Sequence, residues 1–243
     1  AWALAGVPDS AFYQLNRIAT RAGYKDYNHV SADLDLKVLH EDIRWDSLMV
    51  LIKQNKEKAE ANYNWPLVRQ LDTIYHDDQD MRVQIDGMEN QYGRDSKEMQ
   101  DFWKMMIEKD SINLIKVTRI LDAHGWLGPD VVSEQGNTTL FLVIQHGDLA
   151  VQEKYLPMMR EVVKNGKARG SSLALLEDRV ALGQGKKQIY GSQIGRDDST
   201  GVYYVQPLED PDHVDQRRAE VGLGPLAEYV SIWGMTWDPK LYK

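Results

Sequence analysis

Apolar residues recur three and four positions apart along most of this 243-residue chain, and glycine follows several of these segments. This spacing is typical of amphipathic helices, because such positions share one face, and glycine commonly ends a helix. The pattern predicts helices close to the following residues: 11–22, 44–48, 65–85, 99–123, 138–155, 157–164, 168–182, 210–221 and 226–233. We therefore expect a mainly α fold, in a chain long enough to bury a sizeable core.

One region has the pattern of paired strands instead. Residues 187–194 and 202–207 contain alternating apolar and polar positions, and a polar loop with glycine at both ends separates them. Such a pattern predicts a two-stranded hairpin at most. The expected architecture is a helical domain with one small β-hairpin.

The composition excludes several classes of site and partner. The chain has no cysteine, so it has no disulfide, thiolate zinc site, iron–sulfur cluster or thiol nucleophile. Because 37 acidic residues outnumber 29 basic ones, nucleic acid is a poor candidate partner. No apolar stretch approaches the roughly 20 residues that a membrane helix needs, so we expect no membrane span.

The composition turns polar over residues 53–64, which is typical of an exposed helix or a linker. We therefore divide the chain into a helical segment, residues 1–60, and a mainly α domain, residues 61–243. An alternative is that the first helices belong to the main domain.

The first 55 residues resemble the final repeat of a tetratricopeptide array. The run ALAGVPDSAFYQLNRIATRAGY has the pattern of a helix end, a turn and a second helix, and DLDLKVLHEDIRWDSLMVLI matches the closing segment of such repeats in secreted Bacteroidota proteins. One repeat cannot bury its own apolar face, so it must pack on a neighbouring domain or continue upstream. The resemblance implies a protein partner and a secreted or periplasmic location, with a cytoplasmic one left open.

Polar residues interrupt two of the predicted apolar stripes. Asp78 and Arg82 are four residues apart on one helix, so they share a face and can form an ion pair. Asp110, Asn113 and His124 lie on the stripe of the next long helix. Burying such groups without partners costs several kcal/mol at the upper end of the range, so they indicate a site or an internal network. A surface salt bridge and a structural histidine are the simpler alternatives.

A further polar group follows the apolar run at residues 140–144. Gln145, Asp148 and Gln152 are spaced three and four apart, and His146 projects about 100° around the helix from Gln145. Histidine is the natural general acid or base near neutral pH. Gly147 removes a side chain beside it, as a close-approaching ligand would require. The alternative is a core histidine bound by a neighbour.

If the helices that carry these polar groups converge with Asp178 and the segment after it, the polar side chains form one pocket. We predict that His146, Asp148 and Asp178 are catalytic. The predicted substrate-binding residues are Asp78, Gln79, Arg82, Asn113, His124, Gln145, Arg179, Gln188, Tyr190 and Gln193. We expect no metal ion and no cofactor in this pocket.

The order of motifs in residues 65–243 resembles one uncharacterised bacterial family. The motifs read Asp78-Gln79-x-x-Arg82, Asn113, His124-Gly125-Trp126, Gln145-His146-x-Asp148, Asp178-Arg179, Gly185-x-x-Gln188-x-Tyr190-Gly191-x-Gln193 and Val214-Asp215-x-Arg217-Arg218. The resemblance implies one site built from these residues and implies no activity. Gly147 departs from it, because the family pattern has alanine there.

The motifs of several enzyme classes are missing. There is no His-Glu-x-x-His, no Gly-x-Ser-x-Gly and no phosphate-binding or dinucleotide glycine pattern. We therefore favour a metal-independent acid–base enzyme, in which His146 works with Asp148 or Asp178 and Arg82 or Arg179 holds an anionic group. Its reaction would be hydrolysis, elimination or group transfer on a small polar substrate. The alternatives are a non-catalytic ligand- or peptide-binding protein and a structural protein with buried polar networks.

Overall fold

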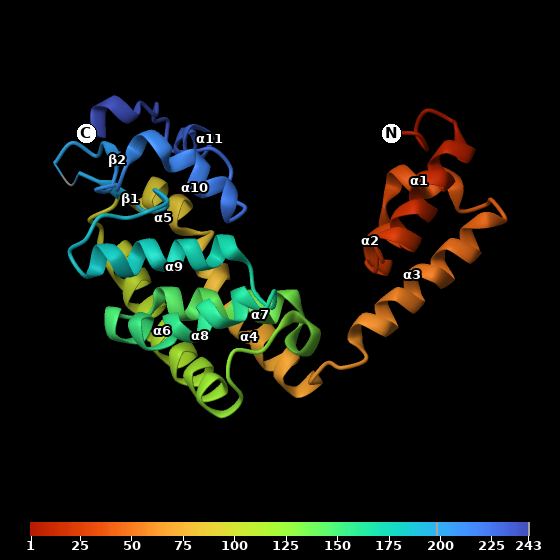
Figure 1. Ribbon diagram of the computed structural model, residues 1–243, viewed down its shortest axis with the longest axis horizontal. Coiled ribbons are helices and arrows are strands. Elements are labelled where there is room, and N and C mark those ends of the chain that lie inside the picture. The colour runs from red at the N-terminus through yellow and green to blue at the C-terminus, as the bar shows by residue number, and fades with distance from the viewer. Residues whose placement is uncertain (198, 243) are drawn as a thin grey trace. The chain divides into compact units, whose positions relative to one another are not determined.

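The computed structural model describes residues 1–197 and 199–242. The chain divides into two compact units, residues 1–63 and residues 64–243 (Figure 1). Helices dominate both units, and one two-stranded sheet is present among the described residues. The prediction of a mainly α fold with one small hairpin is confirmed.

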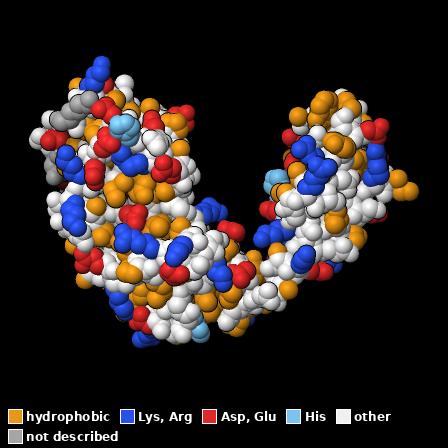
Figure 2. All heavy atoms as spheres, in the orientation of Figure 1, with side chains coloured by type: hydrophobic (Ala, Val, Ile, Leu, Met, Phe, Trp, Pro, Cys, Tyr) orange, Lys and Arg blue, Asp and Glu red, His pale blue; other side chains and the backbone are white. Residues whose placement is uncertain are grey.

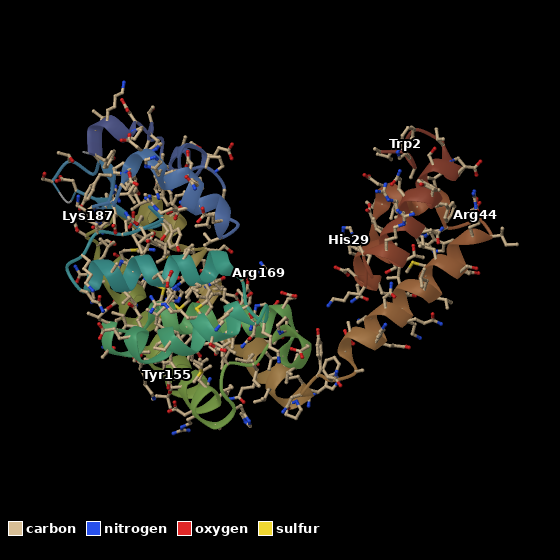
Figure 3. All side chains as sticks on the ribbon, viewed as in Figure 1. Trp2, His29, Arg44, Tyr155, Arg169 and Lys187 are labelled. Carbon is tan, nitrogen blue, oxygen red and sulfur yellow. The ribbon has the colours of Figure 1, made fainter. Side chains whose placement is uncertain are left out.

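The first unit has its own apolar core. Its elements are α1 (Pro8–Arg21), α2 (Tyr27–Ala32), the 3₁₀ helix η1 (Leu34–Leu39) and α3 (Arg44–Glu60). Both α1 and α2 pack against α3, and Phe12, Leu48 and Ile52 are almost fully buried between them. Arg44, at the start of α3 (Figure 3), bonds to the carboxylates of Asp9 and Asp42. The resemblance of this unit to a tetratricopeptide repeat stays a prediction.

The second unit is a group of long helices. In chain order these are α4 (Trp65–Arg82), α5 (Ile85–Tyr92), α6 (Lys97–His124), α7 (Pro129–His146), α8 (Leu149–Lys164) and α9 (Gly170–Gly183). The last part of the chain adds η2 (Pro211–His213), α10 (Val214–Glu220), α11 (Leu226–Ser231) and η3 (Pro239–Tyr242). Helix α7 packs along α4 and also contacts α6, while α8 packs along α9. Leu71, Leu140 and Ile144 are fully buried in the main core that results.

The hairpin is smaller than its predicted extent. Strand β1 (Ile194–Arg196) pairs antiparallel with β2 (Tyr203–Val205), with Gly195 opposite Tyr204. Gln188 makes only an isolated parallel bridge with Leu208. Residues 189–193 form a loop instead of a strand, because side chains rather than a second strand accept several of their backbone N–H groups. The hairpin packs on a second, smaller core that includes residues from α10 and α11.

Two predicted helices, 138–155 and 157–164, are wrong in their boundaries. The chain leaves helical geometry at Gly147, and Asp148 begins α8 by accepting a hydrogen bond from the N–H of Val151 at 2.9 Å. This side-chain cap satisfies a free N–H of the first turn. Pro157 therefore lies inside α8, on its exposed side, rather than in the first turn of a new helix.

The surface carries many charged side chains of both signs, as the 37 acidic and 29 basic residues of the sequence predict. On the face shown in Figure 2, acidic and basic side chains are intermingled on each unit. In the described part of the chain, no helix combines the length and the apolar character needed to cross a membrane.

Candidate functional site

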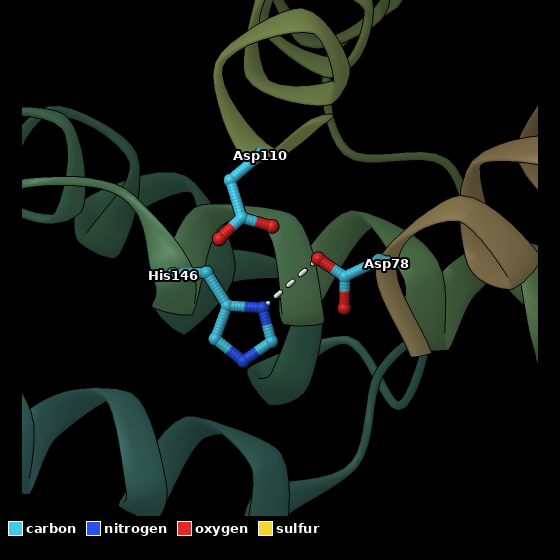
Figure 4. A group of neighbouring side chains, drawn as sticks. All are labelled: Asp78, Asp110 and His146. Carbon is cyan, nitrogen blue, oxygen red and sulfur yellow. Dashed lines mark hydrogen bonds and ion pairs between the residues drawn. The ribbon is translucent and has the colours of Figure 1, made fainter. Parts of the chain in front are cut away.

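The last turns of α4 and α7 bring Asp78 and His146 together. Asp78 is 1% exposed, and its Oδ1 lies 3.0 Å from Nδ1 of His146 (Figure 4). The second ring nitrogen, Nε2, points away from the carboxylates of Asp78 and Asp110 in Figure 4, and it makes no hydrogen bond with the described residues. Helix α7 ends here because Gln152 of α8 donates to the backbone oxygens of Gln145 and Gly147.

Three contacts fix the carboxylate of Asp78. Nε2 of Gln79 donates to Oδ2 at 2.6 Å, and Nη1 of Arg82 lies 3.3 Å from Oδ1, as the four-residue spacing predicted. Burial raises the pKa of Asp78, but the hydrogen bond and charge of His146, the charge of Arg82 and the Gln79 bond together outweigh it, so the pKa is lowered overall. Asp78 is therefore ionised near neutral pH and accepts the Nδ1 proton, so that in the neutral form of the imidazole the lone pair lies on Nε2.

Arg82 joins this pair to a third helix. Its Nη1 donates to Oδ1 of Asp110 at 3.1 Å and its Nη2 to Oδ2 at 2.8 Å, a bidentate pair that holds α4 against α6. One ligand atom from each of Asp78, Asp110 and His146 lies within 4.8 Å of the others, which is close enough to hold a metal ion. Arg82 contacts both carboxylates, so a cation between them would have to displace its guanidinium. The donor set fits an ion-pair network better than a metal site.

Arg179 on α9 is a cation without a counter-ion. It makes no hydrogen bond or ion pair with the described residues, and its buried Nε has no partner. Burial is the main cause that lowers the pKa of Arg179, and the charge of Arg82 lowers it further, although Tyr229 acts in the opposite direction. The guanidinium groups of Arg82 and Arg179 are therefore close enough to repel one another.

A cavity of about 230 Å³ lies beside Arg179. Polar and aromatic groups face it, among them Gln145, Arg179, Ser192, Gln193, Tyr229 and Trp233. Oε1 of Gln145 is buried and has no hydrogen-bond partner. Because Gln145 precedes His146 on α7, the cavity and the Asp78–His146 pair share one helix end.

Asp178 and Gln188 hold the loop that forms one side of this cavity. The carboxylate of Asp178, which is fully buried, accepts the backbone N–H groups of Ile189, Tyr190 and Ser192 at 2.6, 2.9 and 2.9 Å. The amide of Gln188 is equally occupied: it donates to the carbonyls of residues 193 and 206 and accepts the N–H of residue 193. Both side chains hold the loop that carries Ser192 and Gln193, and the three bonds of Asp178 go to that loop rather than to His146.

Other predicted site residues lie apart from His146. Asp148 is exposed and caps α8. His124 is exposed at the end of α6, fourteen residues after Asp110 and so about 21 Å further along the helix axis. The hydroxyl of Tyr190 donates to Glu177. The structure thus brings together Asp78, Gln79, Arg82, His146 and, around the adjoining cavity, Gln145, Arg179 and Gln193.

The prediction that Gly147 makes room for a ligand is wrong. A Cβ at this position would lie 3.0 Å from Cγ1 of Val151 and 3.2 Å from the carbonyl oxygen of Ile144. The space beside Gly147 is filled by the first turn of α8. The glycine serves the tight connection between α7 and α8.

Asn113 is a buried polar side chain whose donor is unused. It lies one turn after Asp110 on the same face of α6, is 1% exposed, and its Nδ2 has no partner. We expect Asn113→Ala to change the free energy of unfolding by less than about 1 kcal/mol, because the lost packing is offset by removing an unsatisfied donor. Urea denaturation measures this change.

Asn137→Ala is the matched control for that prediction. Nδ2 of this second buried asparagine donates to the carbonyl oxygens of Leu127 and Lys167 at 2.8 and 3.1 Å. Its removal leaves two acceptors without that donor, and we expect a loss of about 1–3 kcal/mol. Equal losses in the Asn113 and Asn137 variants would contradict the view that the donor of Asn113 is unsatisfied in the folded chain.

Two groups of site residues were missed by the sequence interpretation. Asp110 stood out as a polar residue on an apolar stripe, but its pairing with Arg82 spans 28 positions and no local pattern predicts it. Tyr229 and Trp233 line the cavity, yet their spacing of four on an apolar helix is equally typical of core residues. Only the packed structure distinguishes the two roles.

Comparison with known proteins gave one match. The model of a family described as "Family of unknown function (DUF6624)" matches residues 66–240 and so includes every residue of the site and the cavity. No curated protein and no solved structure matches the chain. The sequence resemblance of residues 65–243 to an uncharacterised family is therefore confirmed at that level.

Proposed function

Because the chain belongs to DUF6624, a family of unknown function, we propose its function from its own site: a metal-independent acid–base enzyme that acts on a small polar or anionic substrate. In this proposal His146 is the general base or acid and Asp78 orients it. The observation that carries it is the Asp78–His146 hydrogen bond, which leaves Nε2 of His146 unbonded.

The geometry meets the needs of a general base. A buried carboxylate at Nδ1 holds the imidazole in one tautomer and stabilises the imidazolium ion that forms when Nε2 takes a proton. Gln79 and Arg82 keep Asp78 ionised and in place, and Arg82 is itself held by Asp110. Asp148 and Asp178 are left out of the catalytic pair, since their carboxylates bond to backbone N–H groups elsewhere.

The charges around His146 favour an anionic substrate. Two carboxylates, of Asp78 and Asp110, stand against the two guanidinium groups of Arg82 and Arg179. Protonation of His146 then gives the group an excess positive charge, and only Arg179 has its donors free. A proton taken up at Nε2 and an anionic group on Arg179 would stabilise one another. Hydrolysis, elimination and group transfer all fit this arrangement.

The second candidate is a binding protein without turnover. It is favoured by the unpartnered polar atoms of Asn113, Gln145 and Arg179, which a ligand alone would satisfy. In this alternative the helices of the first unit bind a protein partner, and the chain works in a secreted or periplasmic location.

Replacing His146 with glutamine tests the catalytic proposal. Purified protein is offered a panel of chromogenic carboxylic esters, phosphate monoesters and phosphate diesters, and the wild type is expected to turn over at least one class. His146→Gln should lower kcat/KM by about 10²- to 10⁴-fold, because a positioned general acid or base contributes that much.

His124→Gln is the matched control, since this histidine is exposed at the far end of α6. It should leave kcat/KM unchanged. Absence of turnover by the wild type across the panel, or equal activity in His146→Gln and the wild type, would contradict the proposed enzyme.

A further inference from the structure

The cavity is lined by a guanidinium group, that of Arg179, which has no counter-ion among the described residues. A guanidinium has five N–H donors and no acceptor, and burying it without a partner is costly. Arg218, a fully buried arginine nearby, donates to the carbonyl oxygens of Tyr190 and Gly224. Arg82 is bound to Asp78 and Asp110. Arg179 alone among these three has its donors free, and a bound anion would satisfy them.

Three aromatic rings form part of the wall of the cavity. The rings of Tyr229 and Trp233 meet edge to face, with centroids 5.1 Å apart, and Tyr203 lies 6.4 Å from Trp233. All three line the cavity with Arg179. At about 230 Å³ the space is smaller than the 300–1,000 Å³ typical of drug-sized ligands. These walls fit a small molecule with a planar group, because aromatic rings pack well on one another.

A second cavity lies next to the one that Arg179 lines. It measures about 450 Å³ and lies between α5 and the hairpin, with Asp86, Glu89 and Arg196 among its lining residues. Tyr203 and Trp233 line both cavities. These two rings therefore separate the two spaces, and Arg196 in the larger one is already paired with Glu89, which leaves Arg179 as the cation available to an anion.

We propose that Arg179 and the rings of Tyr203, Tyr229 and Trp233 bind a small planar organic oxyanion, a carboxylate or a phosphate ester. Its oxyanion lies on the guanidinium of Arg179 and its planar group lies among the rings. A hydrogen-bond donor on the ligand satisfies Oε1 of Gln145, which is buried without a partner. This inference rests on the proposed function and specifies its substrate class.

Isothermal titration calorimetry with five probes tests the proposal. Benzoate and phenyl phosphate carry both a ring and an oxyanion; benzamide lacks the charge, and acetate and inorganic phosphate lack the ring. We expect benzoate or phenyl phosphate to bind at least tenfold more tightly than the other three. Tighter binding of benzoate identifies a carboxylate site, and tighter binding of phenyl phosphate identifies a phosphate-ester site.

Arg179→Gln should weaken the binding of the better probe by at least tenfold. This variant should fold, since it removes an unpartnered, partly buried charge, and its urea midpoint confirms folding. The matched control is Arg169→Gln, because Arg169 is exposed just before α9 (Figure 3) and pairs with Glu134. It should bind the probe as the wild type does.

Two results would overturn the inference: no binding of benzoate or phenyl phosphate by the wild type at 10 mM (about the weak limit of calorimetry), or equal binding by Arg179→Gln and the wild type. Failure of the proposed enzyme gives a different result. Probe binding without any turnover would leave the cavity in place and contradict catalysis by His146. Turnover that depends on His146, without probe binding, would support catalysis by His146 and contradict the proposed ligand of the cavity.

Discussion

Replacing Asp178 with alanine should lower the free energy of unfolding by about 3–5 kcal/mol. The carboxylate is fully buried and accepts three backbone N–H groups, those of Ile189, Tyr190 and Ser192. Alanine leaves all three donors buried without a partner, and it also removes a negative charge near Arg218. The loop within residues 188–193 then loses the three hydrogen bonds to Asp178 that fix its conformation.

Urea denaturation measures this loss. The slope of free energy against urea should stay unchanged, because the variant still folds to the same compact state. Asp178→Asn should lose less free energy of unfolding, since its one amide oxygen can still accept some of the three N–H groups. Asp122→Ala is the surface control: this carboxylate is 55% exposed and binds Lys154 and Tyr155, so we expect a loss below about 1 kcal/mol.

The same measurement separates two roles for Asp178. The sequence suggested a catalytic carboxylate, because Asp178 and Arg179 come just before the expected hairpin. A residue held for catalysis is often neutral to stability, and its removal can even raise the midpoint. An unchanged midpoint for Asp178→Ala would therefore contradict the structural role and return Asp178 to the candidate catalytic residues.

The helices could be predicted from the sequence because their signal is local. The stripe over residues 99–123 corresponds to α6, Lys97–His124, with an error of two residues at most at each end. The break at Gly147 could not be predicted in the same way. The apolar period continues through it, and only the side-chain cap of Asp148 shows where α8 begins. Where periodicity and capping chemistry conflict, the cap decides.

The contacts of the site also fall into two kinds, those that a local sequence pattern predicts and those that only packing produces. The contact of Asp78 with Arg82 follows from their spacing of four on one helix. Asp110 is 28 positions away from its partner Arg82, and His146 is 68 positions away from its partner Asp78, so packing alone brings them together. The guanidinium of Arg179 has no partner among the described residues, and no sequence pattern predicts which side chain is left without contacts.

The second large effect is expected at Asp78. Asp78→Ala removes the carboxylate that accepts from Nδ1 of His146 and neutralises part of the charge on Arg82. Both partners remain partly buried, so breaking the group should lower the free energy of unfolding by about 3 kcal/mol at pH 7. Asp80→Ala on the same helix is the control; this residue is 64% exposed, and its loss should stay below about 0.5 kcal/mol.

The pH dependence of that loss identifies its electrostatic cause. The pKa of Asp78 is lower in the folded chain than its ordinary value of 3.8, because the bonds and charges of its partners outweigh the opposing effect of burial. The ionised carboxylate therefore stabilises the folded state fully above about pH 4–5, and this contribution is lost as the pH falls through the lowered pKa. Urea denaturation of the wild type and Asp78→Ala should show a larger difference between pH 5 and 7 than at pH 3. A difference that stays the same at pH 3 would mean that Asp78 acts through packing alone, and the case for His146 as an oriented base would lose its main support.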